Sequence, residues 1–200
     1  RFRERPSAIR TIGKEYSAGN RRRVSGPKGR HMLELLRKRR SIRRFKKEPL
    51  SETQIDALKE AVLRSPSSRG IQPWKFFFVR DADLIGKLSR CKEHGSAFLK
   101  DASLAVVVCG DESLSDVWIE DCSIAAIIVH LSAASLGLGS CWIQIRNRMQ
   151  SANTTSEDYV RETLGIAHPM KVLSIVAVGV PDQVKEGHPF ESLDQGKVIG

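Results

Sequence analysis

Residues 117–136 read VWIEDCSIAAIIVHLSAASL, and residues 137–142, which follow them, read GLGSCW. The first stretch is apolar on most sides of a helix, a pattern typical of a helix buried in the centre of a domain or at a subunit contact. Ser115 or Asp116 can cap its start. Gly137 can end it, because glycine adopts the left-handed conformation of a helix C-terminus at little cost. The sequence therefore predicts one long buried helix.

Helices and strands alternate along the rest of the chain. Ser51 and Gln54 form a capping-box signature, and apolar residues then recur at helical spacing as far as Pro66. This order contains many helices and no internal repeat, which favours an α+β or three-layer α/β arrangement. Further short helices are expected from Leu33 into the following basic residues, at 84–88, and from a Ser156 cap to Gly165; strands are expected at 74–79, 104–109, 141–145 and 172–178.

Length and composition set the class of protein. The 200 residues, 40% of them hydrophobic, are enough for one domain that closes its core without disulfides or a structural metal. The longest apolar run, 124–131, is far shorter than the roughly 20 residues that cross a bilayer, and no apolar export signal is predicted, so no membrane span is expected. The cysteines form no C-x-x-C pair, which favours a reduced, cytoplasmic compartment. They are Cys91, Cys109, Cys122 and Cys141.

The formal net charge of +10 is concentrated at one end of the chain. Residues 1–31 hold ten Lys/Arg against two Glu, which leaves 23 Lys/Arg and 21 Asp/Glu for residues 32–200. Because residues 1–31 lack apolar periodicity, we expect a basic extension there and a folded domain over 32–200. Two interpretations of the extension stay open. Met32 could be the original start of the chain, or the extension could be an arm that binds nucleic acid.

A second, local group of cations needs its own explanation. Six Lys/Arg occupy eight consecutive positions on a body that is otherwise nearly neutral. One interpretation is a solvated helix end, where cations offset the helix dipole; the other is a bound anion such as a phosphate. No P-loop and no G-x-G-x-x-G motif is present, so side chains would have to hold the phosphate. The six are Arg37, Lys38, Arg39, Arg40, Arg43 and Arg44.

Two other segments offer possible ligand contacts. The loop at 66–74 brings two hydroxyls, a glycine and an amide to the start of a strand, and the glycines at 137–142 allow the backbone to approach a ligand closely. Each can also be a simple turn. Cys141 has no neighbouring histidine to activate it as a nucleophile, and the histidines lack the spacing of metal ligands, so neither cysteine catalysis nor a metal site is predicted.

Taken in order, these segments resemble the nitroreductase family of flavoproteins. The motifs are RRSIRRF at 39–45, PSSRGIQPW at 66–74, GLGSCW at 137–142 and GVP at 179–181. The resemblance covers the chain from Leu33 to its end. It implies an α+β fold, the three-layer α-β-α nitroreductase arrangement with an antiparallel or mixed central sheet, and an intertwined homodimer with FMN at its interface.

The resemblance also implies which residues bind FMN. Arg39, Arg40, Ser41 and Arg43 would contact the phosphate, ribityl chain and pyrimidine side, and Lys185 would complete the phosphate site. Gln72 would support the loop at 66–74. Pro66, Ser67 and Ser68 would reach the same flavin from the other subunit. The backbone of Gly139, Ser140 and Cys141 would lie against the isoalloxazine.

By the same resemblance, NADH or NADPH would reduce the flavin, which would then reduce a small nitro compound or quinone in a ping-pong reaction. The flavin carries the chemistry, so no catalytic side chain is assigned. Gly70 stands where many members of the family have Asn, and Arg69 precedes it, so the substrate side is the least determined part. Another reaction of this fold, such as reductive dehalogenation or flavin remodelling, stays open. Nucleic-acid binding through the basic N-terminal segment is the remaining alternative.

Overall fold

The structure, a computed structural model, describes residues 30–200, with side chains from Met32 onward. The predicted basic extension at 1–31 lies outside the described residues, except that Arg30 and His31 begin the first helix, α1. The division into an extension and a domain therefore stays a prediction, as does the proposed nucleic-acid arm.

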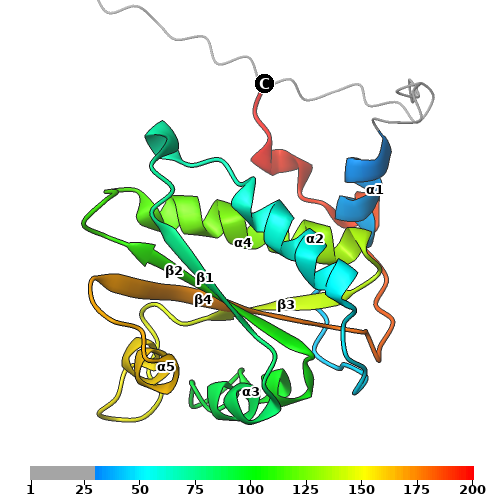
Figure 1. The fold of residues 1–200 in the computed structure, drawn as a ribbon. Helices are drawn as coiled ribbons and strands as arrows, with labels where there is room; N and C mark the ends of the chain where they lie inside the picture. Colours follow the sequence, from blue (N-terminus) through cyan, green and yellow to red (C-terminus); the bar gives the residue numbers. More distant parts are fainter. Residues whose placement is uncertain (1–29) are drawn as a thin grey trace, which may run out of the picture.

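A four-stranded sheet forms the middle of the fold (Figure 1). The strand order is β1-β2-β4-β3, and every neighbouring pair is antiparallel. The two central strands, β2 and β4, are buried along nearly their whole length, because helices cover both faces of the sheet. The strands are β1 (Trp74–Val79), β2 (Leu104–Asp111), β3 (Gly139–Gln144) and β4 (Met170–Gly179).

Helices make the two outer layers. In Figure 1, α2 and α4 lie on one face of the sheet, and α3 and α5 lie on the other. Each face has its own cluster of buried apolar side chains. This arrangement confirms the predicted three-layer α-β-α fold, with the sheet antiparallel. The helices are α1 (Arg30–Lys38), α2 (Glu52–Leu63), α3 (Ala82–Leu88), α4 (Trp118–Ser135) and α5 (Ser156–Leu164).

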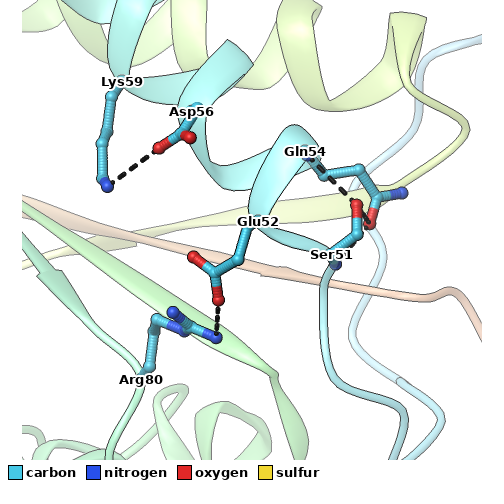
Figure 2. A network of polar contacts seen from close by, with 6 residues as sticks. All are labelled: Ser51, Glu52, Gln54, Asp56, Lys59 and Arg80. Atoms are coloured by element: carbon cyan, nitrogen blue, oxygen red, sulfur yellow. Dashed lines mark hydrogen bonds and ion pairs between the residues drawn. The ribbon is translucent and has the colours of Figure 1, made fainter.

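The predicted capping box begins α2 (Figure 2). The Ser51 hydroxyl accepts the backbone N–H of Gln54 at 3.2 Å, and the Gln54 side-chain oxygen accepts the N–H of Ser51 at 3.0 Å. Glu52, in the first turn, pairs at 2.8 Å with Arg80, which directly follows β1. The start of α2 is thus fixed both within its own turn and to the end of a strand.

The N-caps of two other helices, α4 and α5, differ from expectation. Val117 is the N-cap residue of α4 and provides no side-chain cap, so the prediction of Ser115 or Asp116 was wrong. The cap of α5 is Thr155, which accepts the N–H of Asp158 at 3.0 Å, and not Ser156. The end of α4 was correct, since Gly137 has φ 73°. The following strand, β3, begins two residues earlier than expected.

The central helix α4 is long and apolar enough to cross a membrane by length and composition, with a mean hydropathy of 1.2. It packs on the sheet and α2, and a core helix of this kind meets the same criterion, so the finding is weak support for a span. Ile124 and Ile127 remain about 40% exposed on its outer side. Because these two residues flank the middle of α4, an apolar strip there is left uncovered by the described chain.

We expect Ser51→Ala to lower the free energy of unfolding by about 1 kcal/mol, because the N–H of Gln54 loses its acceptor at the start of α2. Urea unfolding of both proteins measures the difference. Asp56→Ala is the control, since it removes only an exposed pair with Lys59 from the same helix and should cost no more than about 0.5 kcal/mol. Equal effects of the two substitutions would contradict a role for the capping box.

Candidate functional site

A cavity of about 290 Å³ lies beside the turn between α4 and β3. Three segments far apart in sequence form its walls: the end of α1 with the residues after it, the turn itself, and the chain after β4. Four of its lining side chains, from two of these segments, are cations. They are Lys38, Arg39, Arg40 and Lys185.

The arginine-rich segment, residues 39–45, is extended, and backbone hydrogen bonds hold it at two points along its length. The N–H of Ile42 donates to the carbonyl of Ser140 in β3 at 2.9 Å, and the N–H of Lys46 donates to the carbonyl of Val180 at 2.9 Å. The side chains of Ile42 and Phe45 are buried in the core. The segment therefore has a fixed register against the end of the sheet.

Two glycines allow this close packing. A Cβ on Gly139 would come within 2.7 Å of the Ile42 side chain, and one on Gly179 would come within 2.9 Å of the Phe45 ring. Real Cβ atoms essentially never make such contacts. The glycine at 139, which the sequence connected with ligand approach, is thus required by packing against the arginine-rich segment.

The chain after β4 adds polar contacts to the same segment. Lys185 Nζ donates to the carbonyl of Ser41 at 3.2 Å, and the Arg40 guanidinium donates to the carbonyl of Glu186. When the Gln183 amide is turned so that its oxygen faces the arginine-rich segment, that oxygen accepts the N–H groups of Arg43 and Arg44 at 2.6 and 3.3 Å. These bonds gather the cations around one cavity, where an anion would offset their mutual repulsion.

A buried histidine lies behind the cavity. His130, on α4, is only 5% exposed, and its Nδ1 lies 2.7 Å from the hydroxyl oxygen of Ser140. Burial, and secondly the nearby charge of Arg39, lowers the pKa of His130 to about 4. The imidazole is therefore neutral at pH 7 and fixes the side chain of a cavity-lining serine without adding another cation.

Cys141 is buried next to the same cations. Burial raises the pKa of its thiol, against the opposing influence of Arg43, Ser41, Lys185 and Arg39. A thiol with a raised pKa is a poor nucleophile at neutral pH. The expectation that the cysteine carries no chemistry stays a prediction.

The loop between α2 and β1 lies away from this cavity. The N–H of Ser68 donates to Asp121 in the first turn of α4 at 2.8 Å, whereas the cavity lies beyond the last turn of that helix. From Asp121 to Gly137 an α-helix rises about 24 Å. In Figure 1 the loop entering β1 and the start of β3 accordingly lie at opposite ends of α4.

The predicted site residues thus fall into two groups within one chain. The first surrounds the cavity, where Arg39, Arg40, Gly139, Ser140 and Lys185 line the wall and Ser41, Arg43 and Cys141 lie beside it. The second, at the other end of α4, consists of Pro66, Ser67, Ser68 and Gln72.

Three residues that contribute to these two groups were not predicted from the sequence as site residues. Lys38 lines the cavity but was counted only as part of a basic cluster, and His130 was dismissed because it lacked the spacing of a metal ligand. Asp121 was read as part of an apolar helix. A polar residue within such a helix was the available signal, since buried polar groups need partners. Among the residues from Met32 onward, no group of three or more His, Cys, Asp and Glu could hold a metal ion.

Comparison with known proteins identifies the family of this chain. The model of the nitroreductase family matches residues 36–102 and 86–180. A protein of Archaeoglobus fulgidus, named provisionally as an NADH dehydrogenase/NAD(P)H nitroreductase, is 35% identical over 158 residues, or 77% of this chain and 87% of that protein. An iodotyrosine deiodinase of Thermotoga neapolitana is 25% identical over 173 residues, or 79% of this chain and 92% of that protein.

The solved structure of an FMN-dependent nitroreductase from Clostridium difficile R20291 has a TM-score of 0.82 and 42% identity, and the match covers 83% of this chain and 96% of that one. Fold and cavity define an α+β protein with a cation-lined cavity at one end of a buried central helix. The chain belongs to the nitroreductase family of oxidoreductases.

We expect His130 to make stability depend on pH. Its pKa is about 4 in the folded chain and near 6.5 in the unfolded one. Between these values only the unfolded chain binds the proton, so stability present above pH 6.5 is lost as the pH falls towards 4, by up to about 3 kcal/mol. In His130→Asn the amide oxygen can still accept the Ser140 hydroxyl, but this dependence should vanish.

Urea unfolding of both proteins at several pH values between 4 and 7.5 gives the difference. His94→Asn, at an exposed histidine, is the matched control and should follow the parent protein across the range. Parallel pH profiles for the parent and His130→Asn would show that the buried imidazole does not contribute.

Proposed function

We propose that this protein is an FMN-dependent oxidoreductase that passes reducing equivalents from NADH or NADPH to a small nitro compound or quinone. The observation that carries the proposal is the cavity bordered by Lys38, Arg39, Arg40 and Lys185. Cations gathered around a space of this size fit a phosphate group. The sequence has no P-loop and no G-x-G-x-x-G motif that could bind the phosphate instead. The solved relative from Clostridium difficile, named as FMN-dependent, supports FMN as the ligand.

The proposed roles of the site residues follow from where they lie. Arg39, Arg40 and Lys185 hold the phosphate, and Arg43, whose guanidinium lies 5.9 Å above the Phe98 ring, extends the positive region towards Cys141. Ser41, Gly139, Ser140 and Cys141 supply backbone beside the cofactor. FMN, when bound, supplies reversible two-electron chemistry, so that the nicotinamide and the acceptor react in turn. The cations favour the negatively charged reduced form by their electrostatic potential.

We further propose a homodimer in which each site takes residues from both chains. Ile124 and Ile127 flank the middle of α4 and are exposed. A two-fold axis perpendicular to α4 near this point would cover them and set two α4 helices antiparallel, with the start of one near the end of the other. The loop with Pro66, Ser67 and Ser68, supported by Gln72, would then approach the partner's cation-lined cavity.

The compartment is also part of the proposal. All four cysteines are buried and free. This fits a reducing environment such as the cytoplasm, where thiols persist.

Turnover tests the reaction. Without air, protein loaded with FMN should oxidise about one NADH or NADPH per flavin and then stop, and continuous turnover should need an added acceptor. Double-reciprocal plots at several acceptor concentrations should be parallel, because the two substrates react in turn. Quinones, nitroaromatics and iodinated phenols form a suitable panel of acceptors. Activity confined to the iodinated phenols would favour reductive dehalogenation, a possibility that the deiodinase relative supports. Intersecting lines would exclude the ping-pong order.

Arg43→Glu should weaken FMN binding on the order of 100-fold, because a cation that extends the positive region of the flavin site is replaced by an anion. Quenching of flavin fluorescence on titration with protein gives the dissociation constant. Arg90→Glu makes the same change of charge at an exposed position outside the cavity and should bind FMN as the parent does. Unchanged affinity in Arg43→Glu would remove this residue from the site, and a parent protein that binds no FMN would refute the proposed function.

A further inference from the structure

A buried carboxylate anchors the loop between α2 and β1. Asp121 is only 2% exposed, and one of its oxygens accepts the backbone N–H of Ser68 at 2.8 Å. The other accepts the hydroxyl of Ser115 at 3.4 Å. Both partners lie outside the helix that carries Asp121, so the side chain connects the first turn of α4 to the loop.

The backbone of this loop needs such support. Arg69 and Gln72 have φ values of 55° and 53°, in the left-handed region that residues with a Cβ seldom occupy. A conformation of this kind persists only where the surroundings hold it. Two further bonds help: the N–H of Gln72 donates to the Ser67 hydroxyl at 2.9 Å, and Arg69 pairs with Asp116 at 2.5 Å. The Arg69 pair is exposed, which leaves Asp121 as the buried anchor.

The anchored loop is remote from the cations of its own chain. Asp121 is in the first turn of α4, and the cavity follows its last turn. In the proposed antiparallel dimer the loop lies beside the partner's cavity. An effect of Asp121 on flavin binding would therefore act across the interface.

We infer that Asp121 is a positioning residue for the partner's flavin site: by holding the N–H of Ser68, it fixes the loop that completes that site. The inference rests on the proposed function and names a residue that the cofactor itself does not touch. Its distinctive consequence is that damage at Asp121 should appear in the other chain's site.

Single substitutions give the first test. Asp121→Ala leaves the N–H of Ser68 without its acceptor and should weaken FMN binding at least about tenfold. Asp121→Asn should restore affinity to within about threefold, because the amide oxygen can accept the same N–H and its NH₂ can donate to Ser115. Asp83→Ala, which removes an exposed carboxylate from the first turn of α3, is the matched control and should bind FMN normally.

Mixed dimers give the decisive test. One chain carries Asp121→Ala, the other carries Arg43→Glu, and different affinity tags allow isolation of the heterodimer. If Asp121 acts across the interface, one site joins the intact cations of the first chain to the intact loop of the second, and the other site collects both defects. The heterodimer should then bind one FMN per two chains with parental affinity, at a concentration where neither variant homodimer binds.

A heterodimer that binds no flavin with parental affinity, while the parent dimer binds two, would overturn the inference, because each site would then contain one defect. Equal FMN affinity in Asp121→Ala and the parent would overturn it as well. A parent protein without FMN binding would instead count against the proposed function. If Asp121→Ala does not fold, Ser68→Pro replaces it in the mixed dimer, since proline lacks the donor N–H and Ser67 already has the extended conformation that precedes proline.

Discussion

The packing of α4 against the sheet is the contact on which the other parts of this structure depend. Its buried side covers strands β2 and β4, and α2 packs against it, so one face of the sheet is closed by a single apolar layer. Because a helix of 18 residues rises about 27 Å, the same contact also sets a distance. The cavity lies at one end of α4, and the loop between α2 and β1 lies at the other.

Two buried polar residues of α4 also hold neighbouring segments in place. His130 bonds to Ser140 beside the cavity, and Asp121 bonds to the backbone of Ser68 in the loop. A buried polar group left without a partner is costly, so each bond determines where a neighbouring segment can lie. The helix thereby positions residues of both groups, and in the proposed dimer it would link one site to the other.

Local sequence signals predicted those features that a few neighbouring residues decide. The capping box at Ser51 and Gln54 and the left-handed Gly137 were both correct, since their partners lie within one turn. The predicted cap of α4 was wrong, because the helix begins only at Trp118, and the Ser115 hydroxyl instead donates to Asp121 and accepts the N–H of Val117. Gly139 was connected with ligand approach, yet Ile42, almost one hundred residues earlier in the chain, occupies the space that a Cβ would need.

The sequence by itself determined the alternation of helices and strands, the basic segment on a nearly neutral body and the ordered motifs of the family, because composition, periodicity and spacing are properties of the chain. Only the tertiary structure decided which motifs meet. It joins the arginine-rich segment to Ser140 and Lys185 and leaves the loop at Ser68 at the far end of α4. The physical reason is that burial of apolar surface and pairing of backbone groups bring together segments that no local spacing relates.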